Sequence, residues 1–325
     1  MSQSPSASEI PYSAVLDALL DPEIEITQQH LFRLSDLEGK LAREFKKCWP
    51  KIALWRRLAL LEDMEQLAEE NNLLSYEFPC RLSIHDADPQ IRFLAIRGLL
   101  PYEPIDLLPE LTTLLRQDAD ENVRAICAAT LGQFVYLGEI EDISKEQKKN
   151  TVDSLLEASY NDPSVQVRQR ALESLGYTSQ DEIVALIEEA YQTGEVSWIT
   201  SALFAMGRSC NSHWVPKISP MLDHQIPAIR FEAARAAGEL QIKDTIDRLT
   251  ELVEDTNTDV RLAAAWSLSQ IGGEGIRETL ETLLDRSDDT EIDFIQDAID
   301  NLLFNEDMEL FGLMEFSEVD IYDDD

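Results

Sequence analysis

The chain has 325 residues, 44% of them apolar, so it is long enough to bury a sizeable core or to form an extended stack of repeats. Its 63 acidic against 27 basic residues give a formal net charge of -36, and a field this negative repels nucleic acid and anionic membrane surfaces. We therefore expect no nucleic-acid and no membrane partner, whereas a basic protein partner is compatible with the charge.

The start of the chain and its cysteines predict a cytoplasmic protein. Residues 1–8 lack the charged first segment and the apolar stretch of a secretory signal, and no apolar run approaches the roughly 20 residues that cross a bilayer. The cysteines form no Cys-x-x-Cys pair, which is more typical of free, mostly buried thiols than of a zinc site or a disulfide framework. They are Cys48, Cys80, Cys127 and Cys210.

Residues 1–80 are expected to form an irregular helical capping region. Long helices are predicted over Thr27–Lys47 and Ala53–Leu74, separated by Trp49-Pro50. Within the second, Arg56 marks a degenerate version of a phrase that recurs further along the chain. An atypical first unit is expected in a repeat protein, because it must cover the apolar face of the terminal repeat.

From residue 88 onward a phrase close to Asp-x-x-Val-Arg-x-x-Ala recurs. Its arginines are spaced 124 - 92 = 32, 168 - 124 = 44 and 261 - 230 = 31 residues apart. A weaker unit with Ile199 in the arginine position fills the remaining gap, since 199 - 168 = 31 and 230 - 199 = 31, so the period is about 31 residues. The copies are Asp88–Ala95, Asp120–Cys127, Asp162–Ala171, Ile226–Ala233 and Asp259–Ala264.

The period is interrupted once, and it ends near residue 303. The long step contains a polar insertion, Gly138–Asn150, which predicts a surface loop that lengthens the start of the next helix. At Asp293 the arginine position is acidic, which marks the closing unit. We predict a repeat domain over 81–303 and an acidic tail over 304–325, whose apolar cluster Leu310–Phe316 either folds back onto the last repeat or docks to a partner.

Apolar spacing within each repeat predicts two helices. Relative to the arginine, apolar residues recur at -1, +3 and +7, which form one stripe of an α-helix, and the residue at +3 is small enough for close helix packing. Another helical segment precedes each stripe: Leu107–Leu115, Val152–Ala158, Ile183–Tyr191, Ile246–Val253 and Ile276–Leu284. The predicted fold is all-α, an α-solenoid (superhelix) of about seven helical hairpins.

The other residues of the phrase have structural explanations. Asp at the start of the second helix caps free backbone N–H groups, and Pro fits the first turn. The arginine lies beside the core stripe, so we expect it to donate to an acid or a carbonyl of a neighbouring unit and to form a ladder along the stack. The phrase thus predicts stacking and not activity.

The phrase, the helix pair repeated about every 31 residues and the Leu-Gly near the helix end resemble HEAT repeats, specifically the bacterial subgroup called PBS-lyase HEAT-like. The resemblance covers residues 81–303 well and the N-terminal region poorly. It implies the fold but no particular activity, because similar repeats serve as scaffolds, as chromophore lyase subunits and as metal enzymes.

The sequence contains no motif for catalysis, metal binding or cofactor binding. One enzyme branch with this repeat, deoxyhypusine hydroxylase, has His-Glu pairs that bind two irons, but here no histidine precedes Glu and all four are dispersed: His30, His85, His213 and His224. Gly272–Gly275 predicts a turn between helices rather than a nucleotide loop, and Cys210 with nearby His213 is weak evidence for a nucleophile. We therefore predict no cofactor and no enzymatic activity.

Arginines and aromatic residues gather on the helix face opposite the core stripe. They lie five and nine residues after the arginine position, on the side expected to line the concave surface of a solenoid, and they are residue types that anchor protein interfaces. The alternative is that Phe204 and Trp266 pack against the adjacent repeat. The candidate partner-binding residues are Arg97, Tyr177, Phe204, Arg208, Arg235, Glu239, Trp266 and Gln270.

The leading prediction is a non-enzymatic scaffold that binds a protein or peptide segment on its concave face. The alternative is an enzyme or enzyme subunit resembling the HEAT-like subunits of phycobilin lyases, which would carry a bound bilin or a metal. A third hypothesis makes the acidic exterior the functional part, attracting basic partners through a field that salt would weaken steeply.

Overall fold

The computed structural model describes residues 10–178 and 180–319, with side chains as far as Met308. Throughout these residues the regular structure is helical, which confirms the predicted all-α fold class. The chain divides into two compact parts, unit 1 (residues 1–174) and unit 2 (residues 175–325). This division lies inside the predicted repeat domain, and the boundaries expected at residues 80 and 303 stay predictions.

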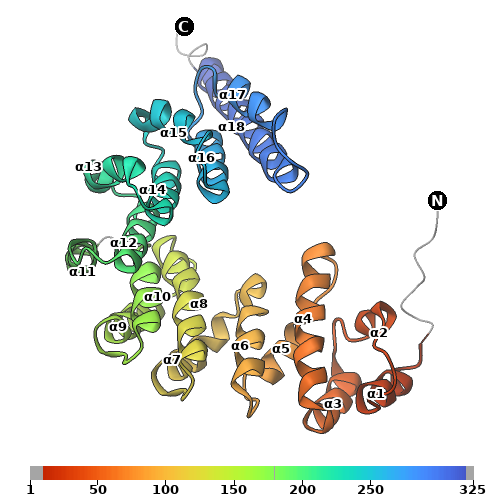
Figure 1. Cartoon of the computed structure of the whole chain (residues 1–325). Helices are drawn as coiled ribbons and strands as arrows, with labels where there is room; N and C mark the ends of the chain where they lie inside the picture. Colours follow the sequence, from red (N-terminus) through yellow and green to blue (C-terminus); the bar gives the residue numbers. More distant parts are fainter. Residues whose placement is uncertain (1–9, 179, 320–325) are drawn as a thin grey trace, which may run out of the picture. The chain divides into compact units, whose positions relative to one another are not determined.

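In unit 1, short turns and 3₁₀ helices join consecutive α-helices (Figure 1). The 3₁₀ helices are η1 (Trp49–Lys51), η2 (Leu100–Tyr102) and η3 (Ile105–Leu107). The α-helices are α1 (Tyr12–Leu20), α2 (Gln28–Phe32), α3 (Gly39–Cys48), α4 (Leu54–Glu70), α5 (Glu77–Ser83), α6 (Pro89–Arg97), α7 (Leu108–Gln117), α8 (Glu121–Glu139), α9 (Lys145–Asn161) and α10 (Val165–Leu175), which ends at the first residue of unit 2.

Unit 2 continues the same alternation. Its 3₁₀ helices are η4 (Ser212–Trp214), η5 (Ser219–Asp223) and η6 (Lys243–Thr245). Its α-helices are α11 (Asp181–Gln192), α12 (Val196–Arg208), α13 (Val215–Ile218), α14 (Pro227–Glu239), α15 (Ile246–Leu252), α16 (Thr258–Ile271), α17 (Ile276–Leu284) and α18 (Ile292–Val319). No helix among the described residues has the length and the apolar character needed to span a bilayer.

Within each unit the helices pack in two layers. In unit 2, α12, α14, α16 and α18 pack on one another in succession and form the second-helix layer, while α11, α15 and α17 each pack on the helix that follows. Figure 1 shows α11, α13 and α15 on one side of this layer. In unit 1, α4, α6 and α8 pack in succession, with α5 against α6 and α7 against α8. Stacked helix pairs of this kind define an α-solenoid, as predicted.

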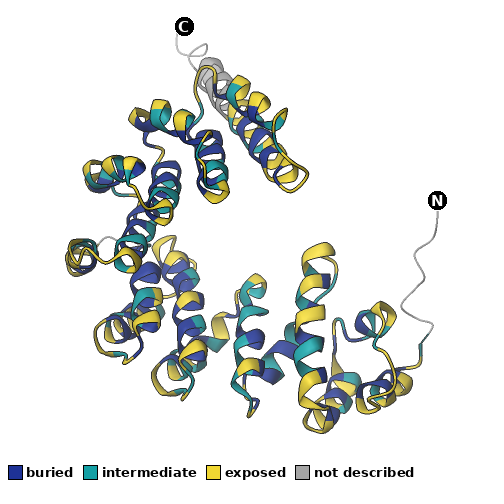
Figure 2. Ribbon diagram, viewed as in Figure 1, coloured by how far each residue is buried: buried dark blue, intermediate teal, exposed yellow. Residues whose placement is uncertain are grey.

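The predicted stripe at -1, +3 and +7 from the arginine forms the core. All of its residues are buried except Trp198, which is half-buried. In Figure 2 the helices carry buried residues on part of their surface and exposed residues elsewhere. The small residues at +3 have 0% exposed surface, so neighbouring helices approach closely there. They are Ala95, Cys127, Ala171, Ala202, Ala233 and Ala264.

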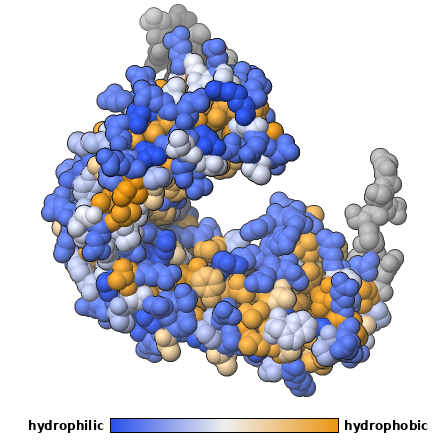
Figure 3. All heavy atoms as spheres, in the orientation of Figure 1, coloured by the Kyte–Doolittle hydropathy of each residue, from blue (hydrophilic) through white to orange (hydrophobic). Residues whose placement is uncertain are grey.

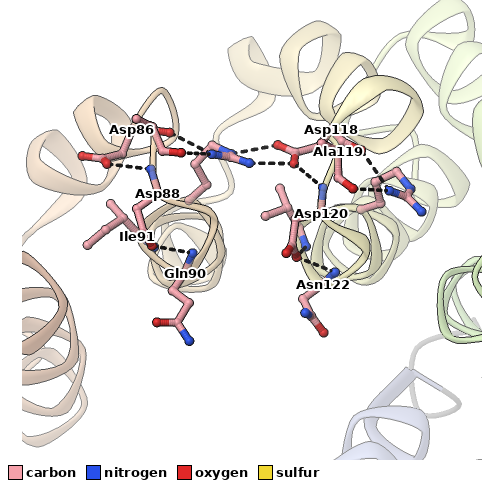
Figure 4. Close-up of polar contacts among 12 residues, drawn as sticks. Asp86, Asp88, Gln90, Ile91, Asp118, Ala119, Asp120 and Asn122 are labelled. Atoms are coloured by element: carbon pink, nitrogen blue, oxygen red, sulfur yellow. Dashed lines mark hydrogen bonds and ion pairs between the residues drawn. The ribbon is translucent and has the colours of Figure 1, made fainter. Parts of the chain in front are cut away.

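Arg92 and Arg124 form the predicted ladder in unit 1, whereas Arg168 bonds, among the described residues, only to backbone carbonyls just before its own helix. The guanidinium of Arg92 donates to both carboxylate oxygens of Asp118, in the following hairpin, at 2.8 and 2.7 Å. Its Nη1 also donates to the backbone carbonyl of Asp86 at 2.9 Å, just before its own helix (Figure 4). Arg124 repeats both contacts, with the carboxylate of Asp162 and the carbonyl of Asp118. Each rung therefore joins two hairpins through charge-assisted hydrogen bonds.

In unit 2 the ladder lacks one rung. Arg230 donates to both carboxylate oxygens of Asp255 at 2.8 Å, and this bonding holds the pKa of Asp255 below its usual range. One hairpin earlier, Ile199 replaces the arginine and His224 replaces the aspartate (255 - 224 = 31), so the described residues form no ion pair at that rung. The rungs present in unit 2 are Arg230–Asp255 and Arg261–Glu291.

In the first repeat, the arginine predicted for the ladder is wrong by one residue. Arg57, not Arg56, pairs with the ladder aspartate Asp86. Arg56 is buried and donates instead to backbone carbonyls between residues 18 and 24. The irregular spacing of this unit, 92 - 57 = 35, hides the register from a sequence-based comparison.

Asp88 and Asp120 are confirmed as helix N-caps, whereas the caps predicted at Asp162 and Asp259 are wrong. Asp162 is the C-cap residue of α9 and lies three residues before α10 begins. Asp88 and Asp120 each accept hydrogen bonds from two backbone N–H groups in the first turn of their helices (Figure 4). In the repeat that contains Arg261, the cap is Asn257, whose side chain accepts a hydrogen bond from the N–H of Val260 at 3.1 Å. The cap lies four residues before the arginine, so Asp259, only two before it, belongs to the first turn of α16 and has no capping role.

The long helix predicted over Thr27–Lys47 is also wrong, because the segment forms two helices, α2 and α3. Asp36 has a φ of 52°, in the left-handed region, and its N–H donates to the carbonyl of Ser75 at 2.8 Å. A turn of this conformation ends a helix. The second long helix, predicted over Ala53–Leu74, is confirmed as α4, although it ends at Glu70.

The insertion Gly138–Asn150 contributes to two helices and leaves only a short loop at residues 140–144. The predicted lengthening of the next helix is confirmed by α9, but α8 also extends, to Glu139. Lys148 of α9 pairs with Glu139 at 2.8 Å and ties the two extensions together. Near the C-terminus, the cluster Leu310–Phe316 falls within the backbone of α18, and its side chains lie outside the described residues.

Candidate partner-binding strip

Seven of the eight candidate residues lie in unit 2. Phe204 and Arg235 occupy the same position on α12 and α14, and Trp266 occupies it on α16, because 235 - 204 = 31 and 266 - 235 = 31. Tyr177 lies two residues after the end of α10. We call this row the aromatic–arginine strip: Tyr177, Phe204, Arg208, Arg235, Glu239, Trp266 and Gln270.

Rings and guanidiniums alternate along the strip. The guanidinium of Arg235 lies 4.9 Å from the ring centre of Phe204, on the preceding second helix, and 5.9 Å from that of Phe231 on its own helix. The guanidinium of Arg208 lies 5.2 Å from the ring centre of Phe204 and 5.5 Å from that of Tyr177. Each such cation–π contact is worth about 0.5–1 kcal/mol at an exposed site. The contacts fix the rings in place and leave part of each side chain open to solvent.

Glu239 balances the charge of both arginines. Its Oε1 accepts from Nη2 of Arg235 at 3.1 Å and lies 3.4 Å from Nη2 of Arg208. Arg235 also pairs with Glu232 at 3.2 Å. The side chains of Arg208 and Arg235 remain 33% and 27% exposed, so the strip offers guanidinium surface whose charge is already largely compensated.

Trp266 and Gln270 continue the strip toward α18. The ring of Trp266 packs at 5.9 Å, tilted by 53°, against Phe294. A Cβ at Gly238 would lie 2.6 Å from Oε1 of Gln270, so this amide rests on the glycine of the preceding second helix. Phe204 and Trp266 each contact the adjacent hairpin, as the packing alternative predicts, and each remains half-buried. Their role in partner binding stays a prediction.

Arg97 is the candidate that does not belong to the strip, because it lies on α6 of unit 1. Its Nε donates to Glu65 at 2.6 Å, and its guanidinium lies 5.6 Å from the ring centre of Phe93, one turn earlier. Arg97 borders a separate, mainly apolar pocket of about 680 Å³ that includes Met64 and Tyr76. The arginine thus has the same kind of aromatic and acidic neighbours as Arg235.

An open pocket of about 500 Å³ lies between α14, α16 and α18, at the Trp266 end of the strip. The +5 and +9 columns contain only two of its eight lining residues, Arg235 and Trp266. The +1 column contains two of the other six, because Phe231 and Phe294 each follow the arginine position directly, and Phe231 shares a helix face with Arg235 at i, i+4. The aromatic and charged residues of its lining are Phe231, Arg235, Asp259, Trp266, Phe294 and Asp297.

The histidines have separate local contacts. In the part of the chain that the structure describes, no three His, Cys, Asp or Glu side chains come together in a group that could hold a metal ion. His30 bonds to Thr27 at its helix start, His85 lies 3.1 Å from Glu110, His213 meets the ring of Trp214 edge-on, and His224 accepts from the N–H of Ile226.

We expect one fast-reacting thiol. Cys48, Cys80 and Cys127 are buried and Cys210 is exposed, as expected of free, mostly buried cysteines. Burial raises the pKa of Cys80 to about 12 and also raises those of Cys48 and Cys127, which keeps these thiols protonated at neutral pH. Titration of the native protein with a disulfide reagent should release about one equivalent quickly, and Cys210→Ser should abolish it. Fast reaction of the Cys210→Ser variant would contradict the buried positions.

Two segments of the chain match models of a known family. Residues 107–137, covering α7 and most of α8, match the model described as HEAT repeat, and residues 215–302, from α13 into α18, match the model described as HEAT repeats. A search of curated protein sequences finds no match.

Several solved structures are similar in fold. The E. coli protein YibA is 22% identical, covering 73% of this chain and 95% of that chain, with a TM-score of 0.42. Human deoxyhypusine hydroxylase in complex with glycerol is 18% identical (80% of this chain, 95% of that chain, TM-score 0.34). The complex of CpcE and CpcF of phycocyanin lyase from Nostoc sp. is 18% identical (70% and 94%, TM-score 0.46). These low values assign no activity to the chain. With a family match in each unit, the chain contains HEAT repeats in both units.

Proposed function

We propose that this chain is a protein-binding module that holds a protein or peptide segment against the aromatic–arginine strip and acts by contact rather than by catalysis. The observation that supports this most directly is the row of half-buried rings and guanidiniums on three consecutive second helices of unit 2. Tyr, Trp and Arg supply most of the binding energy in protein interfaces, and repeat proteins use their extended layers as binding surfaces.

The strip is already organised for binding. Phe204 lies between two guanidiniums, and Glu239 holds both of these arginines. Because the side chains are fixed before a partner arrives, association costs less conformational entropy than it would at a flexible surface. Packed helices lie about 8–10 Å apart, which matches roughly three residues of extended chain at about 3.3 Å each. An extended segment running across the layer would therefore place about every third side chain opposite a new helix.

The test replaces the centre of the strip. The triple variant Phe204→Ala, Arg235→Ala, Trp266→Ala should retain at least tenfold less of the proteins that the immobilised wild-type chain captures from a lysate of its source cells, measured by quantitative mass spectrometry. Tyr191→Ala with Arg248→Ala is the matched control, because it removes an aromatic and a cationic side chain from α11 and α15. Both variants should keep the wild-type circular dichroism spectrum. Equal capture by the triple variant and the wild type would rule out the strip as the binding site.

A further inference from the structure

The pocket at the Trp266 end of the strip has an aromatic ring on each of its three walls. Phe231 comes from α14, Trp266 from α16 and Phe294 from α18. The ring centres of Trp266 and Phe294 lie 5.9 Å apart and the rings are tilted by 53°, so the two rings are not stacked face to face. A volume of about 500 Å³ lies within the range of ligand pockets, about 300–1,000 Å³, and has room for a long side chain.

Two carboxylates border the same pocket. Asp259 and Asp297 are exposed, and neither has an ion-pair or hydrogen-bond partner among the described residues. Asp259 is also free of the capping role, which Asn257 fills. The nearest guanidinium, that of Arg235, is already shared with two glutamates of α14. The pocket and its border therefore carry more negative than positive charge.

Aromatic walls with unpaired carboxylates are the surroundings that a cation prefers. The face of an aromatic ring carries partial negative charge and attracts an ammonium or guanidinium group within about 6 Å. Carboxylates at the entrance add Coulomb attraction and accept its hydrogen bonds. An anionic group would be repelled by Asp259 and Asp297, and a purely apolar one would leave both acids unpaired. The net charge of -36 brings a basic segment toward the chain in the same way, and Figure 3 shows hydrophilic residues over most of the visible surface.

We propose that this pocket receives the cationic side chain, Lys or Arg, of a basic segment in the bound protein. The inference rests on the proposed function and specifies the chemistry of the partner. The cation enters between the rings of Phe231, Trp266 and Phe294, and the carboxylates of Asp259 and Asp297 hold its charged end. The rest of the segment follows the strip toward Phe204.

The binding test uses defined peptides and the full chain. A short fluorescent peptide of alternating lysine and glycine should bind, its arginine counterpart should bind at least as well, and the glutamate counterpart should not. In NMR spectra of the indole N–H groups, the signal of Trp266, identified with Trp266→Phe, should move during the lysine-peptide titration while those of the other four tryptophans stay in place (five Trp in all, 5 - 1 = 4). Failure of the lysine and arginine peptides to bind, or movement of other signals instead, overturns the proposal.

Charge-matched variants separate the pocket from the general acidic field. Asp259→Asn with Asp297→Asn should weaken lysine-peptide binding about tenfold, and Phe294→Ala should weaken it about threefold. The control, Asp244→Asn with Asp247→Asn, removes two exposed acids from η6 and α15 and should change the affinity by less than about twofold. Equal losses in both double variants would mean that only the overall field attracts the peptide, and the pocket assignment would be wrong.

Failure of this inference can be told apart from failure of the proposed function. If Asp259→Asn with Asp297→Asn keeps full capture of cellular proteins while the triple strip variant loses it, the strip binds a partner and the pocket does not take its cation. If the triple strip variant also keeps full capture, the proposed function itself is wrong.

Discussion

Replacing Arg124 with methionine is expected to lower the free energy of unfolding by about 3–5 kcal/mol, because it leaves a buried carboxylate without its partner. The side chains of Arg124 and Asp162 are only 10% and 7% exposed. Two charge-assisted hydrogen bonds, at 2.8 and 3.0 Å, join them. Methionine keeps the apolar part of the side chain, so the loss reports on the guanidinium. Urea titration followed by far-UV circular dichroism measures it.

Arg168→Met is the matched control. Among the described residues, the hydrogen bonds of this guanidinium go only to the backbone carbonyls of Asp162 and Pro163, at 2.7 and 3.4 Å. Loss of these bonds leaves no carboxylate unpaired, and the expected cost is about 1 kcal/mol. If the two variants lose the same stability, the cross-hairpin ion pair is not what makes the ladder important.

Replacing Gly176 with valine is expected to destabilise the protein by about 3 kcal/mol or more, because the backbone of a neighbouring helix occupies the space that the side chain needs. A Cβ at Gly176 would lie 2.7 Å from both the Cα and the carbonyl oxygen of Ala205. Neither atom can move without shifting α12. The thermal unfolding midpoint and the urea midpoint should both fall.

Gly194→Ala provides the comparison in the same unit. Gly194 has a φ of 75°, but a Cβ there would have no atom within 4 Å. Its substitution should cost only the strain of a left-handed backbone, about 1–2 kcal/mol. A Gly176→Val variant that is as stable as Gly194→Ala would show that α12 can shift at little cost.

The sequence predicts the positions of the strip residues, because the repeat period is constant in unit 2. A fixed step of 31 residues places Phe204, Arg235 and Trp266 on equivalent positions of consecutive second helices. Their spacing in the sequence therefore predicts that they lie in one row. Arg97 matches the same column, yet the spacing of repeats does not show that the chain divides near residue 174. Equivalent positions in the repeats therefore predict that two residues belong to one strip only when both residues lie in the same unit.

The remaining errors arise where local patterns compete. Arg56 and Arg57 are adjacent, and only the burial of the first and the contact of the second with Asp86 distinguish them. Asp259 matches the aspartate of the recurring phrase in residue type, whereas Asn257 matches it in position, four residues before the arginine, and Asn257 is the cap. The repeat pattern does not reveal the pocket, because α18, which closes it, belongs to a repeat whose arginine position is occupied by an acid, Asp293.

The missing rung beside Ile199 has a consequence for how unit 2 unfolds. A stack of repeats behaves as a row of nearest-neighbour couplings, and its cooperativity is limited by the weakest of them. Between α12 and α14 no ladder ion pair forms, and the partly exposed pair of Arg208 with Glu239 is longer, at 3.4 Å. The next coupling has the more buried ladder pair of Arg230 with Asp255, at 2.8 Å. We therefore expect α11 and α12 to open at a lower free-energy cost than α14–α16. A segment held along the strip would span this weak coupling, and its binding energy would make unit 2 unfold as a single cooperative block.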